Sequence, residues 1–231
     1  MKILTLSFDD GTVQDRRFVP MLNQRGIKAT FNLNSGLFGT IHDINHEGII
    51  VNHNEILPDE VKSLYRGHEI AVHTVHHPNL LLCDDDTVRH EVGDDKRALE
   101  ALCGYEVVGM AYPGGPFFDD RVISLIRSCG IRYARAVGST HDFTPPEHFL
   151  AWYPTSYERD EDLFELGERF ISTPDPDDRV LLFYVWGHSF EFDKLHSWER
   201  FTRFLDMLAG RSDVRYMTNR EAMEACLAFG K

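Results

Sequence analysis

Short apolar runs alternate along the chain with longer segments whose apolar residues recur at helical spacing. The runs predict seven strands, at residues 2–8, 27–33, 68–74, 105–112, 131–137, 179–186 and 213–218. The helical segments, several of them closed by glycine, predict helices at residues 13–24, 58–67, 84–104, 120–130, 160–171, 197–210 and from Thr218 onward. Strands that alternate with helices in this way are typical of a parallel sheet with helical crossovers.

No linker or change of composition divides the chain, so we expect a single α/β domain over residues 1–231. This length favours a closed or nearly closed barrel over an open sheet. Residues 34–57 lack a clear period and contain His42, His46 and His53. We expect an insertion loop there with room for one short helix. We expect these three histidines and His68 to be solvated loop residues rather than a second metal site.

The charge balance narrows the class of partner. Lys and Arg number 24 against 37 Asp and Glu, a net charge of −13. An acidic surface repels phosphate backbones and anionic lipid, so we expect neither nucleic acid nor membrane as a partner. The four cysteines are far apart and form no CxxC pair, which predicts free thiols. The first residues lack the features of a secretion signal, so we expect a cytoplasmic protein.

Polar residues follow several of the predicted strands. The first strand ends in FDDG, the third in HTVHHP, the fourth in AYPGG and the strand at 179–186 in WGHS. In a parallel barrel these ends meet at one rim, which is where such folds place their chemistry. The sequence therefore predicts a site built from two aspartates, a histidine cluster and a glycine-rich turn.

His73 and His77 are four residues apart, so one turn of chain can project both imidazoles the same way. With a carboxylate they make a three-donor set that leaves a coordination position open, as in catalytic metal sites. His76 is the competing donor. Pro78 favours His77, because it restricts the backbone just after that residue.

Asp9 and Asp10 are adjacent, and neighbouring strand residues point to opposite faces. Both can serve one centre only where the strand breaks, and Gly11 allows that bend. One carboxylate can then bind the cation while the other acts as a general base toward water.

The stretches SFDD, HTVHH, YPGG and WGH, in this order, resemble the motifs of the polysaccharide deacetylases of carbohydrate esterase family 4. The resemblance implies a distorted (β/α)₇ barrel and a metal-dependent hydrolase that removes N-acetyl groups from amino sugars. It implies Asp9 as the catalytic base and His188 as the general acid. It also implies a divalent cation on Asp10, His73 and His77, for which zinc is expected and cobalt, manganese or nickel are possible.

The third family motif normally carries an arginine, and Ala111 stands in its place here. We hypothesise that Arg135, in the next predicted strand, supplies the missing guanidinium and orients Asp9. The fourth motif is not recognisable, and Asp142 or Asp160 are open candidates for a partner of His188.

Aromatic residues near the predicted rim suit a carbohydrate, with Tyr112, Trp152 and Trp186 as candidate binding faces. The turn containing Pro113 and Gly114 offers a backbone N–H to a developing oxyanion. We expect a saccharide substrate carrying an N-acetyl or O-acetyl group. The alternatives are a small amide substrate and a catalytically impaired sugar-binding homologue, and the oligomeric state is left open.

Overall fold

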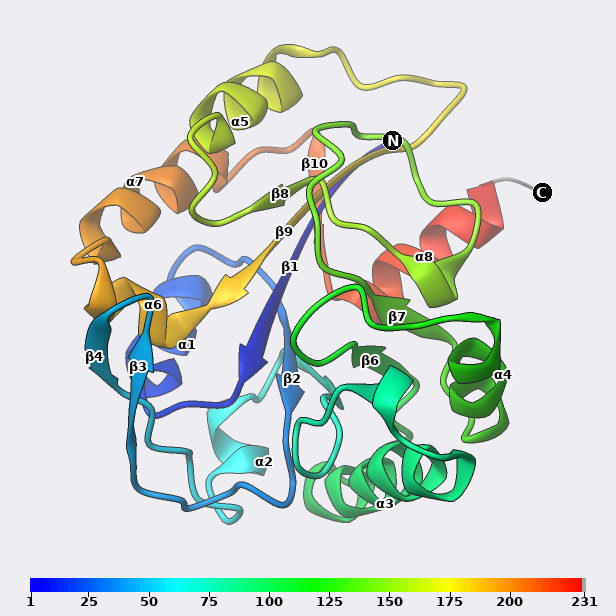
Figure 1. The fold of residues 1–231 in the computed structure, drawn as a ribbon. Helices are drawn as coiled ribbons and strands as arrows, with labels where there is room; N and C mark the ends of the chain where they lie inside the picture. The colour runs from blue at the N-terminus through cyan, green and yellow to red at the C-terminus, as the bar shows by residue number, and fades with distance from the viewer. Residues whose placement is uncertain (230–231) are drawn as a thin grey trace.

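Strand β1 (Lys2–Asp10) lies at the centre of the molecule and is buried over almost its whole length (Figure 1). A continuous apolar run suits a parallel strand that is covered on both faces. The computed structural model describes residues 1–229 of the chain. In it β1 pairs in parallel with β2 (Thr30–Leu33), β9 (Leu181–His188) and β10 (Val214–Met217).

The rest of this sheet also runs in parallel. Its other strands are β5 (Glu69–Val72), β6 (Gly109–Ala111), β7 (Tyr133–Arg135) and β8 (Ser156–Tyr157). Their order is β7-β6-β5-β2-β1-β9-β8. The two edges meet where Trp152 N–H donates to Ala134 O and Ala136 N–H donates to Trp152 O, both at 2.9 Å. The sheet is therefore curled into a distorted (β/α)₇ barrel in a single domain, as predicted.

Helices flank this curled sheet, with α3 and α4 beside β6 and β7 and with α5 and α7 beside β8 and β9 (Figure 1). The α-helices are α1 (Asp15–Asn23), α2 (Val61–Leu64), α3 (Asp85–Cys103), α4 (Asp120–Ser128), α5 (Leu163–Ser172), α6 (Ser189–Lys194), α7 (Trp198–Leu208) and α8 (Asn219–Phe229). Short 3₁₀ turns lie at Leu80–Leu82 and Phe149–Ala151. All seven predicted helices are present, and α6 is an addition that the pattern did not predict.

The predicted last helix begins with a capping box. Thr218 N–H donates to Glu221 Oε2 at 2.9 Å, and Glu221 N–H donates to Thr218 Oγ1 at 3.3 Å. These two bonds satisfy backbone donors that a helix start leaves without a partner.

Aromatic packing fixes the end of β1. The Phe8 ring lies 4.3 Å from that of Phe18 on α1, and Phe18 lies 5.4 Å from Phe192 on α6. Because successive strand residues alternate in direction, Phe8 faces the helices and Asp9 faces the barrel interior. The packing of Phe8 in the core thus sets the direction of the Asp9 side chain.

Trp152 belongs to a second core cluster and not to a pocket wall. It is 1 % exposed, and its ring packs 4.7 Å from Tyr184 and 5.0 Å from Phe149. The expectation that Trp152 offers a face to a sugar is therefore wrong. The backbone of Trp152 forms a parallel bridge with Arg135 on β7, and this places the indole in the core.

The insertion at 34–57 is a hairpin and not a loop with a short helix. Strand β3 (Asp43–His46) pairs antiparallel with β4 (Ile49–Asn52). The two turn residues, Glu47 and Gly48, both have positive φ (54° and 82°), which suits the right-handed twist of a two-residue hairpin. The sequence signal is weak because Glu-Gly is a less common pair at such a turn than Asn-Gly or Asp-Gly.

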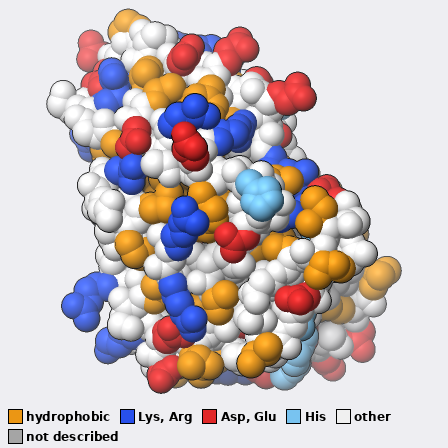
Figure 2. Space-filling view, turned by 90° about the vertical axis from the view of Figure 1, so that its left-hand side faces the viewer, with side chains coloured by type: hydrophobic (Ala, Val, Ile, Leu, Met, Phe, Trp, Pro, Cys, Tyr) orange, Lys and Arg blue, Asp and Glu red, His pale blue; other side chains and the backbone are white. Residues whose placement is uncertain are grey.

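Figure 2 shows basic, acidic and hydrophobic side chains interspersed over the face that holds α5, α7 and the hairpin. Within residues 1–229, no helix combines the length and apolar character that crossing a bilayer requires. The four cysteines are free thiols, as predicted.

Candidate active site

Asp9 and Asp10 occupy the point where β1 breaks. Asp10 and Gly11 have positive φ values of 78° and 73°, a conformation that glycine adopts freely and aspartate adopts at a cost. The bend lets the two neighbouring carboxylates approach one centre. In register, Asp9 lies between Asn32 on β2 and His188 on β9.

Asp10, His73 and His77 offer one donor atom each, and the three atoms lie within 4.8 Å of one another. Asp10 Oδ1 is 3.6 Å from His73 Nε2 and 3.9 Å from His77 Nε2. His73 Nδ1 is 2.9 Å from Ala111 O, so this nitrogen carries the proton and Nε2 keeps its lone pair. The chemistry of this set fits a divalent cation.

The loop after β5 selects His77 over His76. Thr74 and His77 both have positive φ (71° and 61°), and His77 N–H donates to Thr74 Oγ1 at 3.0 Å. His76 is 58 % exposed and its Nδ1 lies 2.8 Å from Glu91 Oε1, away from the other donors. Backbone outliers of this kind gather at functional sites, where the surrounding structure holds them in place.

Arg135 reaches Asp9 from β7. Its Nη2 donates to Asp9 Oδ2, and both side chains are buried. Arg135 pairs in register with Ala111, so the guanidinium lies beside the position where the motif arginine is missing. Asn32 Nδ2 donates to Asp9 Oδ1 at 2.8 Å, and the guanidinium carbon lies 4.2 Å from the centre of the Trp186 ring.

His188 faces Asp9 from the end of β9. Its Nε2 is 3.8 Å from Asp9 Oδ2, and its Nδ1 is 3.8 Å from Glu191 Oε2 on α6. Burial lowers the pKa of His188, but the Glu191 carboxylate with Asp10 and Asp9 outweighs it, so the pKa is raised above its usual value. Burial and the nearby Glu191 charge raise the pKa of Glu158 to about 8.

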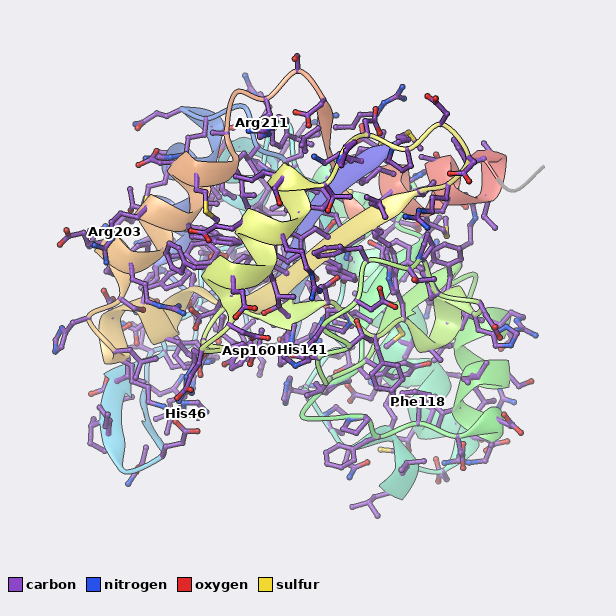
Figure 3. All side chains as sticks on the ribbon, turned by 90° about the horizontal axis from the view of Figure 1, so that it is seen from above. His46, Phe118, His141, Asp160, Arg203 and Arg211 are labelled. Carbon is purple, nitrogen blue, oxygen red and sulfur yellow. The ribbon has the colours of Figure 1, made fainter. Side chains whose placement is uncertain are left out.

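Glu191, and neither Asp142 nor Asp160, is therefore the carboxylate on the Nδ1 side of His188. The Tyr157 hydroxyl lies 3.5 Å from His188 Nδ1 and donates to Glu191 Oε2, so it links the two side chains. Asp160 belongs to a second group of close donor atoms with His141 and Asp162, outside the cavity, and Figure 3 shows His141 and Asp160 side by side. Asp160 Oδ2 accepts from Ser139 Oγ at 2.6 Å and from Tyr157 N–H at 2.8 Å. These bonds give Asp160 a structural role.

His53 is a site residue that the sequence analysis missed. Its Nε2 is 3.2 Å from Asp10 Oδ2, and its Nδ1 is 3.1 Å from Glu55 Oε1. Burial opposes the charged form of His53, but the two carboxylates outweigh it and raise the pKa to about 10. The expectation of a solvated loop histidine is wrong for His53, and also for His68, which is buried with its Nδ1 accepting from Ala29 N–H.

These side chains surround a cavity of about 380 Å³. Its lining comprises Asp9, Asp10, Leu37, Ile44, His46, His53, His73, His77, Tyr112, Gly114, Val137, Trp186, His188 and Phe190. Tyr112, Gly114 and Trp186 thus lie where the sequence analysis expected binding residues, whereas Pro113 is buried behind the wall. A larger hollow of about 750 Å³, between α4 and α8, contains none of the predicted site residues.

The chain matches the family described as polysaccharide deacetylase over residues 1–134. A peptidoglycan-N-acetylglucosamine deacetylase from Bacillus cereus is 29 % identical over 124 residues, which are 52 % of this chain and 38 % of that relative. The match thus spans less than two fifths of the length of that relative.

Solved structures share the fold at low sequence identity. The CE4 domain of a multidomain xylanase from the hindgut metagenome of Trinervitermes trinervoides aligns with a TM-score of 0.61 at 16 % identity, over 97 % of this chain and 90 % of that one. A CE4 family pseudoenzyme from Bacillus anthracis aligns with a TM-score of 0.58 at 18 % identity, over 95 % of this chain and 64 % of that one. At such identities the likeness concerns the fold alone, since one fold hosts active and inactive proteins.

Proposed function

Because the chain belongs to the polysaccharide deacetylase family, we propose that it hydrolyses the acetamido group of an N-acetylated amino sugar to acetate and a free amine. The observation that carries this proposal is the position of Asp9. Its carboxylate lies between the three-donor group and His188, at the base of one cavity. A base, an acid and a cation site meet there within reach of one small substrate.

Asp10, His73 and His77 would hold the cation. When bound, a divalent cation supplies positive charge that polarises the acyl carbonyl. His53 contacts the second oxygen of Asp10, Oδ2, and so leaves Oδ1 directed at the two histidines. Hydrogen bonds of this kind to a ligand's outer atom fix its orientation.

Asp9 serves as the general base. It takes a proton from the attacking water while the new C–O bond forms at the acyl carbon. Arg135 and Asn32 each engage one of its oxygens, so the carboxylate is held in one orientation next to a permanent cation.

His188, whose Nε2 lies 3.8 Å from Asp9 Oδ2, serves as the general acid. The nearby carboxylates raise its pKa, which favours the protonated form, and it donates that proton to the amine nitrogen as the C–N bond breaks. Glu191 lies on the Nδ1 side of the ring and so directs Nε2 into the cavity.

Substitution of Asp9 and of Asp10 by asparagine tests these roles. We expect Asp9→Asn to keep its metal and to lose turnover by at least about 100-fold, because only the proton acceptor is removed. We expect Asp10→Asn to lose both the metal and turnover. The measurements are metal content after purification without added metal, and acetate release from N-acetylglucosamine and its oligomers.

Asp162→Asn is the matched control, because Asp162 belongs to the donor group outside the cavity. It is expected to keep both metal and turnover. Wild-type turnover in Asp9→Asn contradicts the base assignment. Loss of metal from Asp9→Asn, with retention in Asp10→Asn, means that the two aspartates have exchanged roles.

A further inference from the structure

The hairpin of β3 and β4 (residues 43–52) forms one wall of the cavity. Ile44 and His46 on β3, two residues apart and so on one face, line the cavity, as does His53 just after β4. Figure 1 shows the hairpin outside the curled sheet, next to α6, and Figure 3 shows His46 on it.

Two ion pairs hold the tip of the hairpin, one to α6 and one to the segment after β8. Glu47 Oε2 lies 2.5 Å from Lys194 Nζ on α6 and 3.0 Å from Arg159 Nη2, just after β8. The Lys194 side chain is fully buried, and its Nζ also lies 2.7 Å from His46 Nδ1. The Glu47 side chain is 57 % exposed, and its carboxylate gives the buried Lys194 ammonium an ion-pair partner, so removal of Glu47 is expected to leave that charge unpaired.

The base of the hairpin is fastened as well. Val13 N–H donates to Asn54 O at 2.8 Å, and Gln14 Nε2 donates to Asn52 O at 3.0 Å. With both its tip and its base bonded to the barrel, the hairpin is a fixed wall. It forms the wall of the cavity next to α6, where Ile44, His46 and Phe190 line the cavity.

The enclosed space limits what can bind. At about 380 Å³ the cavity is near the lower end of the range of about 300–1,000 Å³ found for small-ligand sites. An internal unit of a polymer needs two exits from the site, one for each neighbouring sugar. A wall fixed to α6 and to Arg159 after β8 is expected to block one of them.

Resting on the proposed function, we propose that the substrate is a single N-acylated sugar unit, either free or at the end of a chain, and not an internal unit of a polysaccharide. The specificity element is the 43–52 hairpin, with Glu47 as its anchor. The free sugar and the chain end share one chemistry, and a comparison of monomer with hexamer separates them.

The test uses N-acetylglucosamine and its hexamer, with the positions of lost acetyl groups mapped by mass spectrometry. Wild-type protein is expected to deacetylate the monomer, a terminal unit of the hexamer, or both. Internal units are expected to stay acetylated.

Two variants open the wall. Replacement of residues 43–52 by a short Gly-Ser turn, and separately Glu47→Gln, are expected to raise the ratio of internal to terminal or monomer deacetylation by at least about tenfold. Asp43→Asn is the matched control, since Asp43 forms no ion pair among the described residues and lies on the exposed face of β3. It is expected to leave the ratio unchanged.

Internal deacetylation by the wild-type protein, or an unchanged ratio in a folded hairpin-shortened variant, overturns the inference while leaving the proposed function intact. Absence of acetate from both monomer and hexamer overturns the proposed function, and the inference with it.

Discussion

Arg135 and Asp9 form a buried ion pair, in which the arginine stands on a different strand from the motif position at Ala111. The guanidinium comes from β7, in register with Ala111 on β6, and it reaches the carboxylate of Asp9. Trp186 covers its flat face, so the charge is fixed in position as well as in sign. Such a pair contributes orientation to the base, and truncation of either partner leaves the other charge buried and alone.

We therefore expect Arg135→Ala to lower kcat by at least about 100-fold, because Asp9 loses the group that orients it. Metal content is expected to stay unchanged. Added guanidinium is expected to restore part of the activity, whereas methylammonium is not, since a planar donor is needed to replace the lost side chain. Arg135→Lys serves as the charge-conserving variant if the alanine variant unfolds, and wild-type kcat in either folded variant contradicts the proposal.

The sequence located most of the site because the fold rule and the motifs agree. Asp9 and Asp10 end β1, and His73 and His77 follow β5, so the meeting of these strand ends brings the four side chains together. His53 was missed because its contact with Asp10 spans 43 residues and depends on a hairpin that the pattern did not predict.

Glu191 was missed for a different reason. It lies three residues after His188, a spacing that brings the two side chains together only if a helix follows the strand directly. Helix α6 has six residues and too little periodicity to be recognised in the sequence. The sequence pattern therefore points to more distant aspartates as partners of His188.

At the level of elements, the sequence predicted which helices and strands exist better than it predicted their lengths. The strands β6 and β7 each have three residues, although apolar runs of seven or eight residues predicted them. The sheet curls at this edge, and the flanking residues leave it to pack in the core. A close approach at Gly109 on β6 marks the curl, because a Cβ there would overlap the ring of Tyr133 on β7.

We expect Gly109→Ala to destabilise the protein by about 2–3 kcal/mol, because a buried ring between two strands has no room to move. Gly93→Ala on α3 is the matched control. A Cβ at Gly93 would meet its nearest atom, Arg97 Nη1, at 3.4 Å, and alanine favours the helix by about 0.5–1 kcal/mol. Urea unfolding of both variants gives the comparison, and equal free energies of unfolding would falsify the packing argument.

For the molecule as a whole, buried titratable groups link folding to pH. His68 accepts a hydrogen bond from Ala29 N–H at 3.1 Å, and burial, with Lys28 nearby, lowers its pKa to about 4. In the unfolded chain a histidine titrates near about 6.5. Between these values the unfolded chain binds the extra proton, so the free energy of unfolding falls as the pH is lowered.

We expect wild-type protein to lose about 2 kcal/mol through His68 between pH 7 and pH 5. His68→Gln keeps an acceptor near Ala29 but cannot take up a proton. Its free energy of unfolding is expected to be lower at pH 7 and to fall less by pH 5, as measured by urea titration at both pH values. An identical loss in the two proteins contradicts the assignment to His68.

The three tryptophans of the chain divide by environment. Trp152 and Trp198 are packed in the core, whereas Trp186 lines the cavity with its ring 5.6 Å from that of His188. Indole fluorescence responds to such neighbours, so the emission of Trp186 is expected to change when the cavity fills, while the other two give a constant background. The chain thus carries its own optical reporter of ligand binding.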